Sequence, residues 1–248
     1  MLLLKMLQRK WIFATLLVLA GTALCIRLGI WQLDRLAQRR AFNAQVLSAR
    51  AESTLDLNQE QPENVAMMEW RSVKATGEYD FSNQVALRNQ YNSNQYGYHL
   101  LTPLRFNEGT AVLVDRGWIP AEGNTNPSDW RKYDEKGVIS VSGQLRAAQT
   151  KPALGGVADK LPANGAKLEL WNNADLTHIA AQMPYPILPV YIQPKPDPND
   201  TTPPIPFQPE VEITEGPHFD YAMQWFTFAA ILFVGYPFFL RKQEEKSK

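Results

Sequence analysis

WIFATLLVLAGTALCIRLGIW (residues 11–31) and YAMQWFTFAAILFVGYPFFL (residues 221–240) are long apolar runs near the two ends of the chain. Each is close to the ~20 residues that an α-helix needs to cross ~30 Å of hydrocarbon at ~1.5 Å per residue. Two such spans leave both termini on one side of a bilayer and the residues between them on the other. The sequence therefore predicts a membrane hairpin that carries an extramembrane domain.

The average composition conceals this layout. The mean hydropathy of −0.31 and the 45% hydrophobic content are typical of a soluble protein, because a polar middle offsets two apolar ends. Residues 32–216 contain 17 Lys and Arg against 22 Asp and Glu. Because binding to nucleic acid requires a clustered basic surface, this acidic balance argues against a nucleic-acid partner.

Basic residues flank both runs at the ends nearest the chain termini and indicate the orientation of the spans in the membrane. Lys5, Arg9 and Lys10 precede the first run, and Arg241 and Lys242 follow the second. Positively charged flanks remain cytoplasmic, so both termini are expected in the cytoplasm. The arginines that follow the first run favour the opposite orientation, but long domains translocate largely regardless of their charge.

The expected organisation follows from these boundaries. It consists of a cytoplasmic N-terminus (1–10), a transmembrane helix (11–31), an extracytoplasmic domain (32–216), a second transmembrane helix (217–240) and a cytoplasmic C-terminus (241–248). The alternative of a cleaved signal peptide is less favoured, since no clean A-x-A site follows the first run. Cys25 is the sole cysteine and lies inside that run, so the domain is expected to contain neither a disulfide nor a cysteine metal site.

Between the apolar runs the sequence changes to a strand-like period of two. The strand-like segments are 71–79, 84–89, 98–105, 111–114, 138–145 and 187–193, with a hairpin loop at 107–109 and a short helix at 175–183. Residues 194–209 contain seven prolines, which predicts a stiff, extended connector that forms no strand ladder; a proline-rich ligand for a partner domain is the alternative. The predicted fold class is an α+β membrane protein, with two transmembrane helices flanking an antiparallel, β-rich or barrel-like domain.

No catalytic constellation is visible in the chain. The sequence has no G-x-S-x-G elbow, no H-E-x-x-H, no phosphate-binding loop and no dinucleotide-binding glycine motif. His99 lies in a strand-like segment and His178 in the short helix, where structural roles are expected. The chain is therefore not expected to be an enzyme, and a membrane-tethered enzyme is a weaker alternative.

His218 lies about one helical turn outside the second apolar run. On a helix it shares a face with Tyr221, Ala222, Trp225 and Ala229, which places an imidazole above aromatic and small residues. An interfacial aromatic belt explains the tyrosine and the tryptophan equally well at this stage.

A second cluster lies at the end of the first run that faces the domain, at the same depth in the membrane as His218. Trp31, Gln32, Arg35 and Arg39 follow helical spacing there and are expected to pack beside His218. An imidazole, flat apolar walls and arginines suit an amphipathic metalloporphyrin, with the imidazole on iron and an arginine on a propionate. Alternatively, the arginines only extend their charges into the interface.

Four segments carry a resemblance to a known family: LGIWQLDR (28–35), GYHLLTPL (97–104), VDRGWIP (114–120) and HFDYAMQWF (218–226). Together, in this order and with two spans, they resemble the surfeit locus protein 1 family over essentially the whole chain. Asp115 stands where that family more often has Asn, and residues 154–170 match no part of its pattern. For Arg116, Gly117 and Trp118 the choice lies between a structural corner and contact with a partner or a haem edge.

The resemblance implies a function in the assembly of cytochrome c oxidase and related haem–copper oxidases. It implies haem a as a transient cargo, with His218 as the iron ligand and Gly29, Trp31, Gln32 and Arg35 on the facing helix. The implied partners are the oxidase catalytic subunit and haem a synthase. The short chain, without an Arg- and Ser-rich, acidic-poor leader, is expected to lie in a bacterial plasma membrane. A scaffold that stabilises the nascent subunit without binding haem is the alternative function.

Overall fold

The computed structural model describes residues 6, 8–106, 109–149, 156–162, 165–209 and 211–246. The flanking Lys5 and most of the predicted hairpin loop, Asn107 and Glu108, lie outside these residues. The chain divides into two compact units. One comprises Met1–Gln45 and Glu212–Lys248, and the other comprises Val46–Val211.

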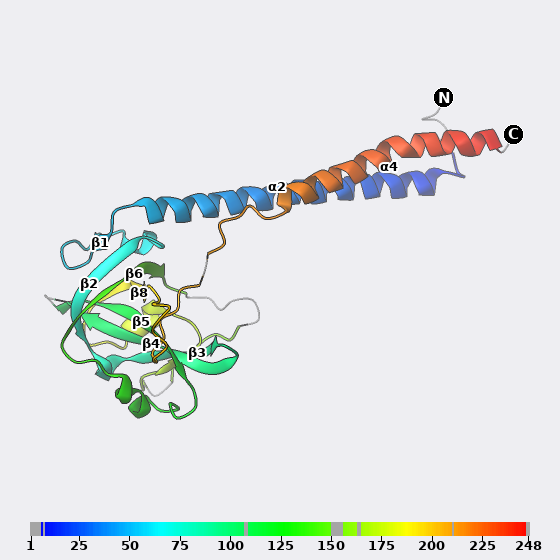
Figure 1. Ribbon diagram of the computed structural model, residues 1–248. Coiled ribbons are helices and arrows are strands. Elements are labelled where there is room, and N and C mark those ends of the chain that lie inside the picture. The colour runs from blue at the N-terminus through cyan, green and yellow to red at the C-terminus, as the bar shows by residue number, and fades with distance from the viewer. Residues whose placement is uncertain are drawn as a thin grey trace. The chain divides into compact units, whose positions relative to one another are not determined.

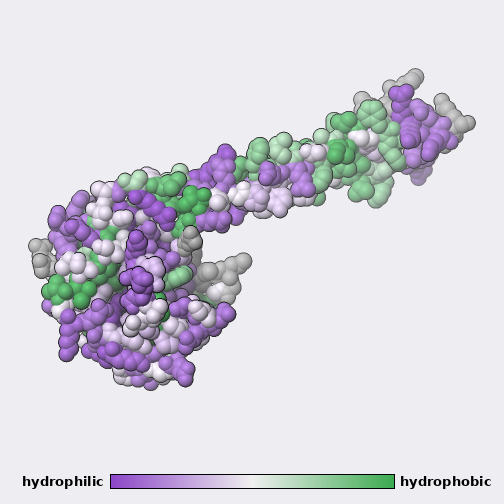
Figure 2. Space-filling view, in the orientation of Figure 1, coloured by the Kyte–Doolittle hydropathy of each residue, from purple (hydrophilic) through white to green (hydrophobic). Residues whose placement is uncertain are grey.

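The first unit is a pair of antiparallel helices, α2 (Ile12–Ala51) and α4 (His218–Lys246), which lie side by side with both chain termini at one end (Figure 1). Both helices are long and apolar enough to cross a membrane. Figure 2 shows apolar surface concentrated on one part of the pair, next to a hydrophilic tip, while the middle of the pair is more mixed. The predicted pair of candidate membrane-spanning helices is therefore confirmed, and α2 continues well beyond its apolar run.

The two helices meet along a seam that repeats every seven residues. On α2 the seam contains Thr15, Thr22, Gly29, Leu36 and Asn43, and all of these residues are buried. On α4 the buried positions Ala222, Ala229 and Tyr236 follow the same interval. A seven-residue repeat of buried positions is the pattern of antiparallel helices packed in a left-handed supercoil.

Small and polar seam residues allow close approach and fix the register of the pair. A β-carbon at Gly29 would lie 2.6 Å from the Phe226 ring, so any larger residue would force the ring or the helix to move. Near the other end, the Thr15 and Tyr236 hydroxyls are hydrogen-bonded at 2.8 Å. Small residues and interhelical hydrogen bonds are what hold helices together where lipid surrounds them, because the hydrophobic effect does not drive their association there.

The second unit is built on one eight-stranded sheet with the order β1-β2-β6-β8-β5-β4-β3-β7. The strands are β1 (Leu55–Asp56), β2 (Ser72–Tyr79), β3 (Val85–Asn92), β4 (Gln95–Arg105), β5 (Ala111–Pro120), β6 (Val138–Ala147), β7 (Leu170–Trp171) and β8 (Ile187–Pro194). Short helices η1 (Val65–Met67), η2 (Phe81–Asn83), η4 (Pro127–Tyr133) and α3 (Leu176–Ala180) lie between them. An additional pairing of β2 with β4 closes the sheet into a barrel.

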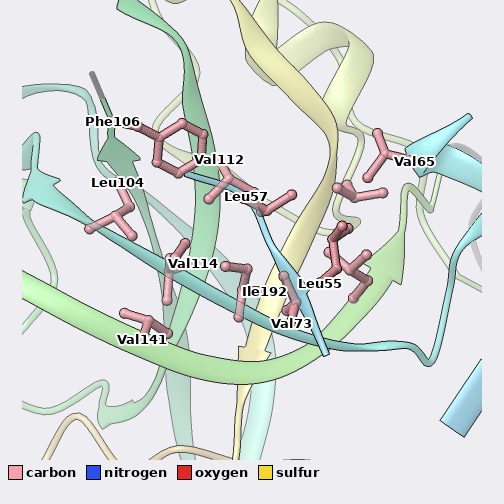
Figure 3. Close-up of a cluster of buried hydrophobic side chains, with 13 residues drawn as sticks. Leu55, Leu57, Val65, Val73, Leu104, Phe106, Val112, Val114, Val141 and Ile192 are labelled. Carbon is pink, nitrogen blue, oxygen red and sulfur yellow. The ribbon is translucent and has the colours of Figure 1, made fainter. Parts of the chain in front are cut away.

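The barrel encloses the main hydrophobic core. Figure 3 shows Leu104, Val112, Val114, Val141 and Ile192, which come from four strands and point into a common interior. All five are buried. Alternating apolar residues on each strand face this interior, which is why the sequence shows a period of two.

The predicted fold class is confirmed, and each of the six strand-like segments corresponds to an observed strand. The sheet is not purely antiparallel, because β5 and β8 pair in parallel, as do β1 with β2 and β3 with β7. The proline-rich connector also departs from expectation at Ile205, which forms an isolated bridge with Trp118 on β5. Ile205 retains the N–H that its proline neighbours lack, so it can pair where they cannot.

Candidate functional site

Two of the three histidines contact carboxylates within the barrel domain and have structural roles there. His99 on β4 is buried, and its Nδ1 lies 3.0 Å from the Asp115 carboxylate on β5. Asp115 also accepts a hydrogen bond from the Gly117 N–H at 3.1 Å, so the pair braces two adjacent strands. His178 Nδ1 lies 2.7 Å from Asp175, the residue that caps α3. These contacts agree with the structural roles expected for both histidines.

The Arg116–Trp118 segment forms a structural corner on the barrel. The Arg116 guanidinium lies over the rings of Tyr79 and Phe81 and donates hydrogen bonds to the Glu135 carboxylate and the Tyr133 carbonyl. Burial raises the pKa of Tyr79 beneath it. Gly117 has φ +119°, and a β-carbon there would collide with the Ile205 carbonyl. The motif thus holds η4 and the connector on the barrel.

His218 occupies a different position, at the first residue of α4. Its Nδ1 lies 2.8 Å from Oε1 of Gln32 on α2. Because an amide carbonyl oxygen only accepts, Nδ1 is the donor in this contact, and Nε2 is the ring nitrogen left to face a ligand. Among the described residues, none hydrogen-bonds Nε2.

The other predicted site residues surround this contact on one side of the helix pair. Successive residues of an α-helix are rotated by about 100° about its axis. Trp31 is rotated by about 100° from Gln32, and Arg35 by about 60° in the same direction. On α4, Tyr221 is rotated by about 60° from His218. Since the helices run in opposite directions, these offsets fall on the same side of the pair. Trp31 is 46% exposed and Tyr221 is 48% exposed, so both present aromatic surface.

Trp225 lies closer to the seam. It is partly buried, and its ring meets Phe228 edge-to-face with the centroids 6.0 Å apart. Ala222 and Ala229, which lie on the same side of α4 as Trp225, are buried in the seam. The structure thus brings His218 and Gln32 into direct contact. Trp31, Arg35, Tyr221 and Trp225 lie around this contact, and within the described part of the chain none of the four hydrogen-bonds the imidazole.

The arginines at this level divide into two groups. Arg39 donates to the backbone carbonyls of Glu212 and Thr214 at 2.6 and 2.9 Å, and Arg40 forms a two-pronged ion pair with Glu215 at 2.8 Å. The hydrogen bonds from Arg40 hold the pKa of Glu215 below its usual range. Arg39 and Arg40 therefore fasten the segment that enters α4.

Arg35 is not part of that fastening. Within the described part of the chain it donates only to Gln38, on its own helix, at 2.9 Å. Its guanidinium has five donors, so most remain available to an acidic group on a ligand. Of the arginines near His218, Arg35 is thus the best placed to meet an anion.

Asn43 and Phe226 also shape the site and were not predicted from the sequence. Asn43 donates to the Thr214 carbonyl at 3.0 Å, and Phe226 packs on Gly29, one turn from Gln32. The seven-residue interval from Gly29 through Leu36 to Asn43 is the signal that identifies the seam.

The donor set of the site suits a flat, amphipathic ligand with a metal centre. One imidazole nitrogen can coordinate iron, aromatic side chains can cover apolar ring edges, and Arg35 can bind a carboxylate. Elsewhere in the described residues no group of three or more His, Cys, Asp or Glu side chains could hold a metal ion. Coordination at this site would therefore rely on one protein nitrogen, an arrangement that fits a porphyrin better than a bare ion.

The fold and the site define a barrel domain joined to a pair of candidate membrane-spanning helices, with a histidine–glutamine contact where α4 begins. The family model of the SURF1 family matches residues 19–230, so the chain belongs to this family. It is 27% identical to a SURF1-like protein of Rickettsia felis over 234 residues, which cover 91% of this chain and 96% of that protein. A SURF1-like protein of Caenorhabditis elegans is 24% identical over 247 residues, which cover 90% of this chain and 72% of the relative.

Proposed function

We propose that this protein is a non-catalytic assembly factor for a haem–copper oxidase, which binds haem a and passes it to the catalytic subunit. The observation that carries the proposal is the 2.8 Å contact between His218 Nδ1 and Gln32 Oε1. A histidine that ligates a metal commonly donates its other ring N–H to a fixed acceptor, and this contact has that form.

The surroundings of the imidazole support haem as the cargo. Trp31, Tyr221 and Trp225 supply aromatic surface on one side of the pair, and Arg35 offers donors to a propionate. Haem supplies the iron, while the chain contributes the ligand nitrogen, the apolar walls and the cation. A site on the flank of two helices is accessible from the membrane, which suits a ligand that must be handed on.

The proposed setting is the plasma membrane of a bacterium, with both termini in the cytoplasm and the barrel domain outside. The basic residues that flank the two helices at the termini support this orientation. In this setting the oxidase catalytic subunit would receive the haem, and haem a synthase would supply it.

The alternative function is a scaffold that stabilises the nascent oxidase subunit and never binds haem. Purifying the full-length protein after co-expression with the enzymes that make haem a distinguishes the two functions. Haem delivery predicts a Soret band at a defined ratio to protein. Colourless, correctly folded protein under these conditions would refute haem delivery and favour the scaffold.

Three substitutions test the assigned roles in order of severity. His218→Ala should remove the haem, since no other histidine lies among the described residues of this site. Arg35→Ala should weaken binding by about 1.5–3 kcal/mol if a charge-assisted hydrogen bond is lost. Trp225→Leu should cost only about 1 kcal/mol, because apolar area is largely retained. Circular dichroism of each variant checks that the helices and the barrel remain folded.

A further inference from the structure

Among the described residues, Gln32 is the only one that hydrogen-bonds the His218 imidazole. It is an amide, whereas ligand histidines in proteins often donate to a carboxylate. Gln32 is half-buried on α2, one turn from the tight contact between Gly29 and Phe226. Its position is therefore set by the packing of the helix pair.

We propose that Gln32 is a positioning residue that keeps His218 a weakly donating ligand, so that bound haem remains transferable. This inference rests on the proposed function. A neutral amide oxygen orients the imidazole and fixes its tautomer, but it withdraws the Nδ1 proton less than a carboxylate does. The Nε2 nitrogen consequently donates less electron density to iron than it would with a carboxylate behind it.

The surroundings of Nε2 are consistent with ligand exchange. Gly216 has φ +65°, and a β-carbon on it would lie 3.6 Å from Nε2. Glycine both permits the left-handed backbone and leaves that approach open. During transfer the bond from Nε2 to iron breaks while a ligand of the acceptor forms its own, with no change in oxidation state.

Two substitutions at Gln32 separate its two proposed effects, the neutral charge behind the imidazole and the hydrogen-bond acceptor that orients it. Gln32→Glu keeps an acceptor but adds charge, so haem transfer from the full-length protein to apomyoglobin should slow at least tenfold. If the carboxylate favours the ferric over the ferrous state by tenfold, the midpoint potential falls by about 59 mV. Gln32→Leu removes the acceptor, and the haem affinity should fall by about 10- to 100-fold.

Gln45→Glu is the matched control, because it adds the same charge to an exposed position of α2 away from His218. It should leave the transfer rate and the potential unchanged. Haem-free protein with ¹⁵N-labelled histidine provides an independent measurement: His218 should carry its proton on Nδ1, and Gln32→Leu should shift the resonance towards a tautomeric mixture.

Each outcome either supports or overturns the inference. Slower transfer and a lower potential in Gln32→Glu alone support it. If both Gln32 variants match the wild type and Gln45→Glu while His218→Ala still loses haem, the role of Gln32 is wrong and the proposed function survives. If the wild type never binds haem, the proposed function itself fails, whatever tautomer the labelled histidine adopts.

Discussion

Gly29→Ala tests whether the close packing of α2 on α4 holds the His218 site together. The added β-carbon would lie 2.6, 2.8 and 2.9 Å from three carbons of the Phe226 ring. Carbon atoms pack best at about 3.5–4.0 Å, so the ring or the helix must move by about 1 Å. Overpacking of this kind costs about 1–3 kcal/mol, against a gain of up to about 1 kcal/mol in helix propensity.

That displacement should reach the site, which lies one turn away on α2. A shift of about 1 Å stretches the 2.8 Å contact between His218 and Gln32 beyond hydrogen-bond range. We expect the haem affinity to fall about tenfold, equivalent to about 1.4 kcal/mol. Spectral titration of the purified full-length variant with haem measures this loss.

Two other glycines of the helix pair provide controls. A β-carbon at Gly21 would lie at an ordinary 3.5 Å from Leu232, and one at Gly235 would have nothing within 4 Å. Alanine at either position should leave haem affinity unchanged. Adding Phe226→Ala to Gly29→Ala removes the collision and should restore part of the affinity. Wild-type affinity in Gly29→Ala alone would show that the packing does not position the site.

Three further predictions concern topology and the barrel domain. A reporter fused after Lys248 should be active only in the cytoplasm, and one inserted at Asn124 only outside; the reverse pattern would overturn the proposed orientation. Residues 43–216 should fold as an isolated domain without a metal ion or a disulfide, and unfolding of this fragment by a chelator or a reductant would contradict that expectation. Burial raises the pKa of Asp80, but hydrogen bonds to the carboxylate, including one of 2.7 Å from Tyr185, have a larger effect. The pKa of Asp80 therefore lies below the usual 3.8. Tyr185→Phe should therefore lower the free energy of unfolding by about 1 kcal/mol at neutral pH, allowing for solvent screening, and urea titrations should show this loss shrinking as the pH falls through the Asp80 pKa.

Local patterns account for most of what the sequence predicted of the fold. The apolar run from Trp11 to Trp31 is a helix because its length and hydropathy permit little else, and the period of two located the barrel strands. Closure of the barrel depends on the pairing of Glu78 with Arg105 and of Tyr79 with Leu104. These residues lie far apart in the chain, and no local signal marks which strands meet.

The site shows the same division between local and non-local information. Helical spacing and the depth of the two apolar runs were sufficient to place Gln32 near His218. The spacing did not reveal that Tyr221 lies beside the seam rather than in it, because the seam follows the seven-residue interval of Ala222 and Ala229. The hydrogen bonds of Arg39 to backbone carbonyls were also hidden, since any carbonyl can accept and the sequence does not show which one is near.

Chemical rescue of His218→Gly tests the ligand assignment most directly. Glycine removes the imidazole and leaves Gln32 to accept a hydrogen bond from an added imidazole molecule in its place. We expect the purified variant to bind no haem in buffer and to regain the Soret band of the wild type when free imidazole is supplied, whereas the wild-type spectrum should not change. A variant that keeps its full haem load without imidazole would show that iron is held by another group.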